Sequence, residues 1–178
     1  MEIDNRVPHQ WRRLSYHHPS ISQTSIMPIA ETMLAILPTL FLSTHLRRGD
    51  YHGHCKRMPQ ACDLFGEMSF VQNLTLVTSV LKSECERSGI YTIFVATDDH
   101  SFMRELNGAQ NATTILFLSS ESLLKNMYPR LSQRPDQVSF AEQIVAGMAM
   151  HFIGNRFSSF SNTIVNYRLQ ANRTFEYW

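Results

Sequence analysis

Residues 91–99 read YTIFVATDD, in which an uncharged run rich in β-forming residues leads into a threonine and two aspartates. A strand without charge is typical of the centre of a parallel sheet, because helices cover both of its faces there. A second apolar run, Leu40–Leu46, ends in the charged segment HLRRGD, residues 45–50. The two runs predict buried strands over 40–46 and 91–96, each followed by polar side chains at its carboxyl end.

Helical patterns alternate with these strands along the chain. Pro28 falls in the first turn of the first expected helix, Pro38 ends that helix and Gly89 ends the next one. Ser120 is the expected cap of a later helix. Residues 128–137 are expected to be a proline-rich loop. We expect helices over 24–36, 69–88, 101–106, 120–127, 139–150 and 161–168, and further strands over 114–118 and 151–155. This alternation predicts the fold class α/β, a Rossmann-like parallel sheet flanked by helices.

The chain of 178 residues is long enough for one domain, and 43% of its residues are hydrophobic. We expect residues 1–22 to be an irregular tail or the remnant of a truncation, and 23–178 to form the domain. A net charge of +1 excludes a general polyanion binder, so no nucleic-acid partner is expected and any anion site must be local. The longest apolar stretch, 36–42, is too short for a membrane span, and residues 1–18 lack the apolar segment of a signal peptide.

Cysteines and glycosylation sequons indicate whether the protein enters the secretory pathway. Cys55, Cys62 and Cys85 form no CxxC pair, which argues against a structural zinc site. They are either free thiols or, in an oxidising lumen, include a bridge between the first two. Three Asn-x-Ser/Thr sequons, at Asn73, Asn111 and Asn172, exceed the chance expectation of about one and favour a secretory route.

The end of the first strand is a candidate anion site. Strand alternation places His45 and Arg47 on one face, with Leu46 and Arg48 on the other. A guanidinium at the mouth of a parallel sheet suits a diphosphate, because it offers a planar fork of donors and keeps its charge. Two alternatives stay open here: a solvated turn with a local ion pair, or the adhesive tripeptide Arg-Gly-Asp at 48–50.

The end of the last predicted strand is a second anion-site candidate. Residues 157–161 read FSSFS and lead into a helix, whose first amides and positive dipole attract phosphate. The alternative is that these serines only cap the helix.

Three segments together resemble a known family. His45-x-Arg47-Arg48-x-Asp50 resembles the HxRRxD segment of the metal-independent fucosyltransferases that use GDP-fucose. VATDD, residues 95–99, resembles their second peptide. Residues 142–160, which include HFIGN and SSF, are similar to the third, most closely in the GDP-fucose protein O-fucosyltransferases. The resemblance extends from about residue 39 to the end of the chain, in the order and spacing of that family.

The resemblance implies roles for individual residues. Arg47 would be the catalytic residue, binding the β-phosphate of the donor and stabilising the departing GDP. The pyrophosphate would be held by Ser158, Ser159 and the backbone of Phe160, and the nucleotide would be contacted by His45. Glu142 stands where the family usually has an aspartate near the guanine. The remaining expected donor-binding residues are Arg48, Asp50, Asp98 and Asp99, of which the last two could equally cap the helix near Ser101.

The implied activity is a metal-independent, inverting transfer of fucose from GDP-fucose to an acceptor hydroxyl, on Ser or Thr of a protein or on a glycan. Negative charge grows on the β-phosphate as fucose leaves, and Arg47 would neutralise it without a metal or a cofactor. His52 and His54 are candidate general bases by position only, and otherwise surface histidines. The implied fold is the C-terminal half of a two-domain GT-B glycosyltransferase, in the endoplasmic reticulum or Golgi lumen. The alternatives are a non-catalytic nucleotide-sugar-binding fragment or pseudoenzyme, and an Arg-Gly-Asp interaction domain.

Overall fold

The computed structural model describes residues 23–49, 73–109, 115–125, 128–131, 133–156 and 158–178. Within them, five strands form one sheet, and all of its neighbouring strands run parallel. In chain order they are β1 Leu42–Leu46, β2 Thr92–Thr97, β3 Leu116–Leu118, β4 His151–Gly154 and β5 Phe175–Tyr177. The spatial order β3-β2-β1-β4-β5 is that of a doubly wound Rossmann sheet, which confirms the predicted α/β fold class.

The strands bury side chains on both faces, as the uncharged sequence of 91–96 predicts. Ile93 and Val95 of β2 belong to one hydrophobic cluster, whereas Phe94 and Ala96 belong to a second cluster on the opposite face. All four are fully buried. Because successive strand residues point to opposite faces, both faces of the sheet need a cover of helices.

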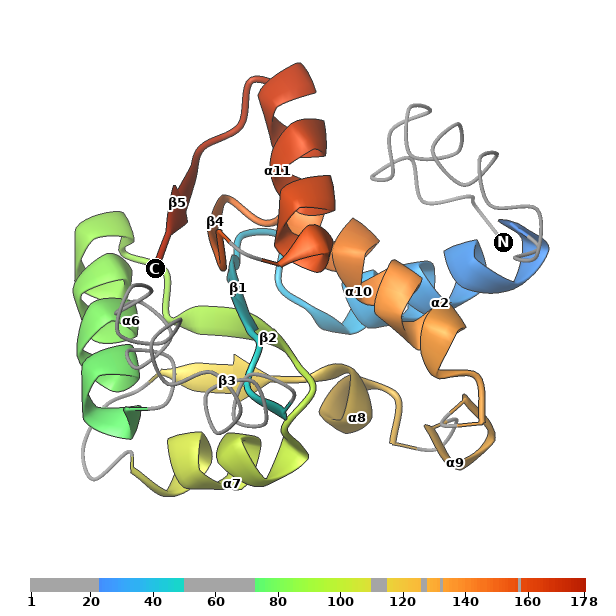
Figure 1. Ribbon diagram of the computed structural model, residues 1–178, viewed down its shortest axis with the longest axis horizontal. Coiled ribbons are helices and arrows are strands. Elements are labelled where there is room, and N and C mark those ends of the chain that lie inside the picture. Colours follow the sequence, from blue (N-terminus) through green and yellow to red (C-terminus); the bar gives the residue numbers. More distant parts are fainter. Residues whose placement is uncertain (1–22, 50–72, 110–114, 126–127, 132, 157) are drawn as a thin grey trace, which may run out of the picture.

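Helices supply that cover on the two sides (Figure 1). The side chains of α6 Leu74–Ser88 and α7 His100–Gly108 fill the cluster that contains Ile93. The opposite face is covered by α2 Gln23–Ile36, α10 Pro135–Met148 and α11 Ser159–Gln170. Two short helices, α8 Ser120–Leu123 and α9 Tyr128–Leu131, lie between β3 and α10 in the chain.

Local signals fix the ends of α6 and α7. Asn73 precedes α6 and its Oδ1 accepts a hydrogen bond from the backbone N–H of Leu76. The helix stops at Gly89, whose φ of 71° is a left-handed conformation that glycine adopts without steric cost. This confirms the predicted stop. At the start of α7, the carboxylate of Asp99 accepts from the amides of Ser101 and Phe102.

Three local predictions were wrong, and one strand was missed. Pro28 lies inside α2, beyond its first turn, because that helix already begins at Gln23. Ser119 caps α8, in a reciprocal arrangement with Ser122, and Ser120 is the first helical residue. The proline-rich stretch 128–137 is no continuous loop, since it contains α9 and the first turn of α10, where Pro135 lacks only an N–H that no helical bond would use. Strand β5 was not predicted, because FEY at 175–177 is too short for a recognisable alternation.

The buried side chain of Arg168 connects β5 to the neighbouring loop through hydrogen bonds. This side chain is fully buried and donates hydrogen bonds to the carbonyl oxygens of Ala149, Met150 and Thr174 at 2.8, 3.0 and 2.8 Å. Burial lowers its pKa to about 10. One guanidinium therefore joins α11 to the loop before β4 and to the segment that leads into β5.

Several predicted features lie outside the described residues: the tail at 1–22, Asp50, His52, His54, Cys55, Cys62 and Asn111. Cys85 is described as a free, fully buried thiol, and its pKa is raised to about 11 by burial and by the neighbouring Glu84 and Glu86. None of the described helices has the length and apolar character needed to cross a membrane.

Candidate functional site

A cavity of about 520 Å³ opens where the carboxyl ends of β1 and β2 meet the starts of α8, α10 and α11. Its volume is in the usual range for small-molecule sites. The strand order turns back on itself at β1, which lies between β2 and β4, and ligands of doubly wound sheets bind at this switch point. The cavity is lined by His45, Arg47, Thr97, Asp98, His100, Ser120, Pro135, Val138, Ser139, Glu142 and Phe160.

The predicted facing of the residues at the end of β1 and just after it is confirmed. His45 and Arg47 line the cavity. Leu46 instead lies in the core beneath α6 and α7. The guanidinium carbon of Arg48 lies 3.5 Å from the centroid of the Phe102 ring of α7, and its side chain is only 12% exposed. Arg47 is therefore placed to meet a ligand, and Arg48 is placed to hold α7 against the strand end.

Asp98 positions the backbone and side chain that follow β1. Its Oδ1 accepts a 2.8 Å hydrogen bond from the amide of Arg48, and its Oδ2 lies 3.5 Å from Nε of Arg47. A Cβ on Gly49 would lie 3.1 Å from the same Oδ2, so the absence of a side chain there allows this close approach. The aspartate thus holds Arg47 at the cavity wall.

Asp99 has a structural role, which agrees with the capping alternative for this residue. It caps α7, accepts from the Ser101 hydroxyl and lies 3.2 Å from Nε of Arg48. Although partial burial opposes the effect, hydrogen bonds from Ser101, Arg48 and Phe102 hold the pKa of this carboxyl below its usual value. It is not among the residues that line the cavity.

His45 is held by the first turn of α11. Its Nδ1 lies 2.8 Å from Oγ of Ser161, and its ring lies 4.3 Å from the ring of Phe160, tilted by 30°. Ser161 is fully buried and also accepts a 2.8 Å hydrogen bond from the amide of Asn155. The serine hydroxyl can either donate to Nδ1 or accept a second hydrogen bond from Nδ1–H, so both contacts fix the ring orientation of His45 with either tautomer.

Glu142 is the acidic residue of the cavity whose ionisation is most perturbed by its surroundings. Its Oε1 accepts a 2.6 Å hydrogen bond from the hydroxyl of Ser120. Burial raises the pKa of Glu142 to about 7, although the Ser120 hydrogen bond opposes that shift. A carboxyl group with a pKa near neutrality can exchange its proton when a ligand brings hydrogen-bond donors to it.

The two remaining serine predictions stay untested. Ser158 is the N-cap residue of α11, but its side chain makes no capping hydrogen bond, and Ser159 is the exposed first residue of the helix. Neither lines the cavity, whereas Phe160 does. The amides of this first turn lack partners within the helix, as at every helix start, so a site for an anion beside Phe160 remains a prediction.

The structure adds cavity residues that the sequence did not single out. Thr97 donates a 2.8 Å hydrogen bond to the carbonyl of Leu46 and accepts from the amide of Asp99, which fixes the end of β2 against β1. Ser120 was predicted only as a helix cap. The other additions are His100, Pro135, Val138 and Ser139. Only the strand end that carries Thr97 gave a signal in the sequence, because α8 and α10 reach the cavity through tertiary packing.

Comparison with known proteins gives matches at the level of structure alone. No protein-family model and no curated protein sequence matches the chain. A crystal structure of POFUT1 in complex with GDP superposes with a TM-score of 0.61 and 19% sequence identity, covering 88% of this chain and 48% of that one. POFUT1 in complex with GDP-fucose gives 0.63, and its apo form 0.62, each at 19% identity and covering 88% of this chain and 46% of that one.

The chain has an O-fucosyltransferase-like fold. It spans about half the length of the solved structures that it matches, and its sheet and helices correspond to one half of a GT-B glycosyltransferase. The predicted segments HLRRGD, VATDD and 142–160 all contribute to the candidate site of this O-fucosyltransferase-like fold. Of the predicted residues that the structure describes, five line the cavity: His45, Arg47, Asp98, Glu142 and Phe160.

Proposed function

We propose that this chain is the donor-binding half of a fucosyltransferase and that its cavity binds the GDP part of GDP-fucose. One observation carries the proposal: a guanidinium, an imidazole and a carboxyl, from Arg47, His45 and Glu142, line one cavity at the switch point of the sheet. The fold supports it, since the similar POFUT1 structures were solved with GDP and with GDP-fucose.

Arg47 would bind the diphosphate. Its side chain lines the cavity and is 36% exposed, and its Nε lies 3.5 Å from Oδ2 of Asp98, which holds the guanidinium at the cavity wall. As fucose leaves, negative charge accumulates on the β-phosphate, and a fixed cation stabilises that charge in the transition state. The transfer that we propose is therefore inverting and independent of metal, with the first turn of α11 adding donors from Ser158, Ser159 and the Phe160 backbone.

Glu142 would recognise the guanine. Guanine presents a ring N–H and an amino group on one edge, and a carboxylate can accept a hydrogen bond from each. The hydroxyl of Ser120 already donates to Oε1 of Glu142, and that oxygen can accept a second hydrogen bond. Adenine lacks this pair of neighbouring donors, so Glu142 would favour GDP over ADP. His45, stacked on Phe160, would contact the nucleotide beside it.

The acceptor would be a hydroxyl group, on Ser or Thr of a protein or on a glycan, and the secretory lumen is the compartment that we propose. Two of the three sequons are described, and both Asn73 and Asn172 are exposed. Asn73 caps α6 through its Oδ1, and its amide nitrogen makes no hydrogen bond within the part of the chain that the structure describes, which suits attachment of a glycan.

Thermal unfolding of the purified chain with GDP, GDP-fucose, ADP and UDP tests donor binding. A ligand at a hundredfold excess over its Kd adds about 2.7 kcal/mol to the free energy of unfolding. We expect stabilisation by GDP and GDP-fucose and none by ADP or UDP. An Arg47→Ala variant, which removes the proposed phosphate contact, is the matched control and should lose the response. Equal stabilisation by all four nucleotides, or by none, contradicts the proposal.

A second measurement separates the enzyme from a non-catalytic nucleotide-sugar-binding module. Release of GDP from GDP-fucose in the presence of a serine- or threonine-bearing acceptor indicates transfer, whereas tight binding without release indicates the module. An Arg-Gly-Asp interaction domain is disfavoured, because Arg48 is only 12% exposed, lies on the Phe102 ring and pairs with Asp99. An integrin-type ligand must present that guanidinium to solvent.

A further inference from the structure

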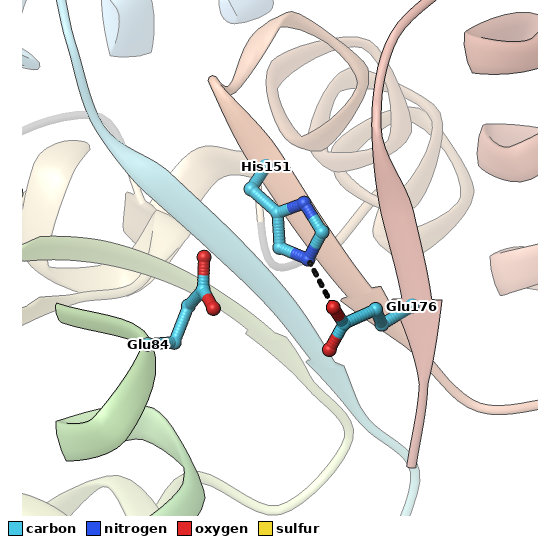
Figure 2. A group of neighbouring side chains, drawn as sticks. All are labelled: Glu84, His151 and Glu176. Carbon is cyan, nitrogen blue, oxygen red and sulfur yellow. Dashed lines mark ion pairs between the residues drawn. The ribbon is translucent and has the colours of Figure 1, made fainter. Parts of the chain in front are cut away.

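A second cluster of polar side chains lies away from the cavity, beneath the helix α6. Glu84 of α6, His151 of β4 and Glu176 of β5 converge on one point, as Figure 2 shows. One ligand atom from each residue lies within 4.8 Å of the other two. None of the three lines the proposed nucleotide cavity, and His151 is the first residue of β4, at the opposite end of the strand from that cavity.

Two of these side chains are buried where an ionisable group is costly. Glu84 and His151 are each 6% exposed, whereas Glu176 reaches the cluster from the exposed face of the edge strand. Charged or polar groups at such depth need partners, and a metal ion is one of the partners that proteins use. Glu84 is partly compensated by Arg87, which donates to both of its carboxylate oxygens at 2.8 Å.

His151 directs an unsatisfied nitrogen into the cluster. Its Nδ1 lies 2.9 Å from Oγ1 of Thr174, whereas its buried Nε2 makes no hydrogen bond with any group that the structure describes. Oε1 of Glu176 lies 3.9 Å from Nε2, beyond hydrogen-bond distance but close enough for a shared cation. Because Thr174 can donate to the carbonyl of Met150, it can accept from Nδ1–H, which leaves the lone pair on Nε2.

We propose that Glu84, His151 and Glu176 bind a divalent transition-metal ion of the Zn²⁺ class. One imidazole nitrogen and two carboxylates form a mixed ligand set that suits Zn²⁺ better than Mg²⁺ or Ca²⁺, which prefer oxygen alone. Tetrahedral Zn²⁺ needs neighbouring ligand atoms about 3.3 Å apart. The 3.9 Å gap between His151 and Glu176 closes by a small movement of the glutamate, whose side chain is 60% exposed and whose Oε1 also lies 3.8 Å from Nη2 of Arg87.

The surroundings of the cluster resemble those of metal ligands in other proteins. Ligating histidines donate their second ring nitrogen to an oxygen acceptor, as Nδ1 of His151 can to Thr174, and ligating carboxylates are themselves hydrogen-bonded, as Glu84 is by Arg87. A carboxylate accepts about four hydrogen bonds or metal contacts, so Arg87 and a cation can share Glu84. The fourth position of the ion would face solvent beside Glu176 and hold water.

Such an ion would attach the last strand to the rest of the fold. β5 has three residues, pairs only with β4 and forms one edge of the sheet. A cation held by α6, β4 and β5 would cross-link three elements that are far apart in the sequence. It would be a structural ion, separate from the metal-independent chemistry proposed for the cavity, and its existence does not rest on that proposal.

Titration of the full, untagged chain with Co²⁺ and Zn²⁺ after chelator treatment tests the site. Co²⁺ reports its ligands through visible absorption, and thiolate ligation adds an intense near-ultraviolet charge-transfer band that nitrogen and oxygen ligands lack. We expect one ion per chain, no thiolate band, and displacement of Co²⁺ by Zn²⁺ but not by Mg²⁺. Calorimetry then gives the Zn²⁺ affinity of each variant.

The decisive variant is Glu176→Gln, because the residue is exposed and its loss as a ligand leaves the core unchanged. We expect at least about 10-fold weaker Zn²⁺ binding, since even outer partners of a metal site contribute that much. Glu86→Gln is the matched control: Glu86 is exposed on the same helix, pairs with Lys82 and lies outside the cluster, so its affinity should equal that of the parent. No saturable Zn²⁺ binding up to about 1 mM, a thiolate band, or equal affinities in parent and Glu176→Gln would overturn the proposal.

Discussion

The hydroxyl of Ser120 donates a 2.6 Å hydrogen bond to Oε1 of Glu142, and this bond links the start of α8 to α10 at the wall of the cavity. Two effects on Glu142 oppose one another there. Burial favours the neutral acid, whereas the hydroxyl donor favours the carboxylate, and the net result is a pKa raised to about 7. The protonation state of this wall of the cavity therefore changes within the physiological pH range.

GDP-fucose affinity should rise with pH through this pKa. Recognition of guanine donors requires the carboxylate form, which is present in about one molecule in ten at pH 6 and nine in ten at pH 8. We expect about 10-fold weaker binding at pH 6 than at pH 8, measured by calorimetry. GDP-fucose is the appropriate ligand, because the terminal phosphate of GDP titrates near pH 6 and would add its own pH dependence.

Replacing Glu142 by Gln should remove this pH dependence and weaken binding at pH 8, since an amide presents only one acceptor oxygen to the two guanine donors. Ser120→Ala should shift the midpoint of the pH profile upward, because it removes the hydrogen bond that stabilises the carboxylate. A profile that is unchanged in Glu142→Gln would mean that another group controls the pH dependence.

Replacing Arg47 by Ala should weaken ligand binding, whereas replacing Arg48 by Ala should lower stability. Loss of Arg47 removes a charged hydrogen-bond donor from the cavity and should weaken GDP binding about 10- to 100-fold. Its effect on the free energy of unfolding should be within about 0.5 kcal/mol, because the side chain is partly exposed. Loss of Arg48 should instead lower that free energy by about 1–2 kcal/mol, through the Phe102 ring and Asp99.

Calorimetry with GDP and chemical denaturation of both variants separate the two roles. Arg47→Lys is a useful third variant, since lysine keeps the charge but loses the planar fork, and should bind GDP with intermediate affinity. Equal losses of GDP affinity in the Arg47 and Arg48 variants would contradict the opposite facing of the two side chains.

The central strands and their facing were predictable because they depend on local sequence. An uncharged β-rich run identifies β2, and strand alternation alone separates Arg47 from Arg48. Helix stops such as Gly89 are also local. These features follow from backbone conformations and side-chain periods that each segment imposes on itself.

Other features depend on contacts between distant segments and left no signal in the sequence. Ser120 and Glu142 are 22 residues apart and meet only because α8 and α10 pack beside the same strand ends. β5 is a strand because β4 offers it an edge, and its three residues show no alternation that could be read in advance. The capping role of Asp99 was one of two interpretations of the same residue, and its contacts with Ser101 and Arg48 support that one.

Gly154 should not tolerate a methyl group. A Cβ at this position would lie 2.7 Å from Cε1 of Phe152 and 3.2 Å from Cβ of Ser161, both within the packed core beside the cavity. We expect Gly154→Ala to lower the free energy of unfolding by about 1–3 kcal/mol through overpacking. GDP affinity should fall as well, because Ser161 holds His45.

Gly108→Ala is the control for the glycine substitution. A Cβ there meets no heavy atom of the described residues within 4 Å, and the residue is the last one of α7. Alanine should leave the free energy of unfolding unchanged or raise it by up to about 1 kcal/mol. Denaturant titration measures both variants, and similar behaviour of the two would show that the space around Gly154 can relax.

In the C-terminal third of the chain, we expect the replacement of Arg168 to lower the free energy of unfolding most. Its buried guanidinium satisfies the carbonyls of Gly147, Ala149 and Met150 at the end of α10, and that of Thr174 ahead of β5. Arg168→Ala removes one donor from each of these carbonyls, although Gly147 keeps a hydrogen bond from Arg173 and Met150 a longer one from Thr174. Each buried unsatisfied group costs about 1–3 kcal/mol, so we expect a loss of at least about 2 kcal/mol from the carbonyls of Ala149 and Thr174. Arg168→Lys should lose less stability, because an ammonium keeps the charge and three of the five donors.

Arg173→Ala is the matched comparison, since Arg173 also donates to Gly147 and Met148 but is only partly buried. If denaturation gives Arg168→Ala no larger loss than Arg173→Ala, then water replaces the guanidinium and β5 is held mainly by its backbone pairing with β4.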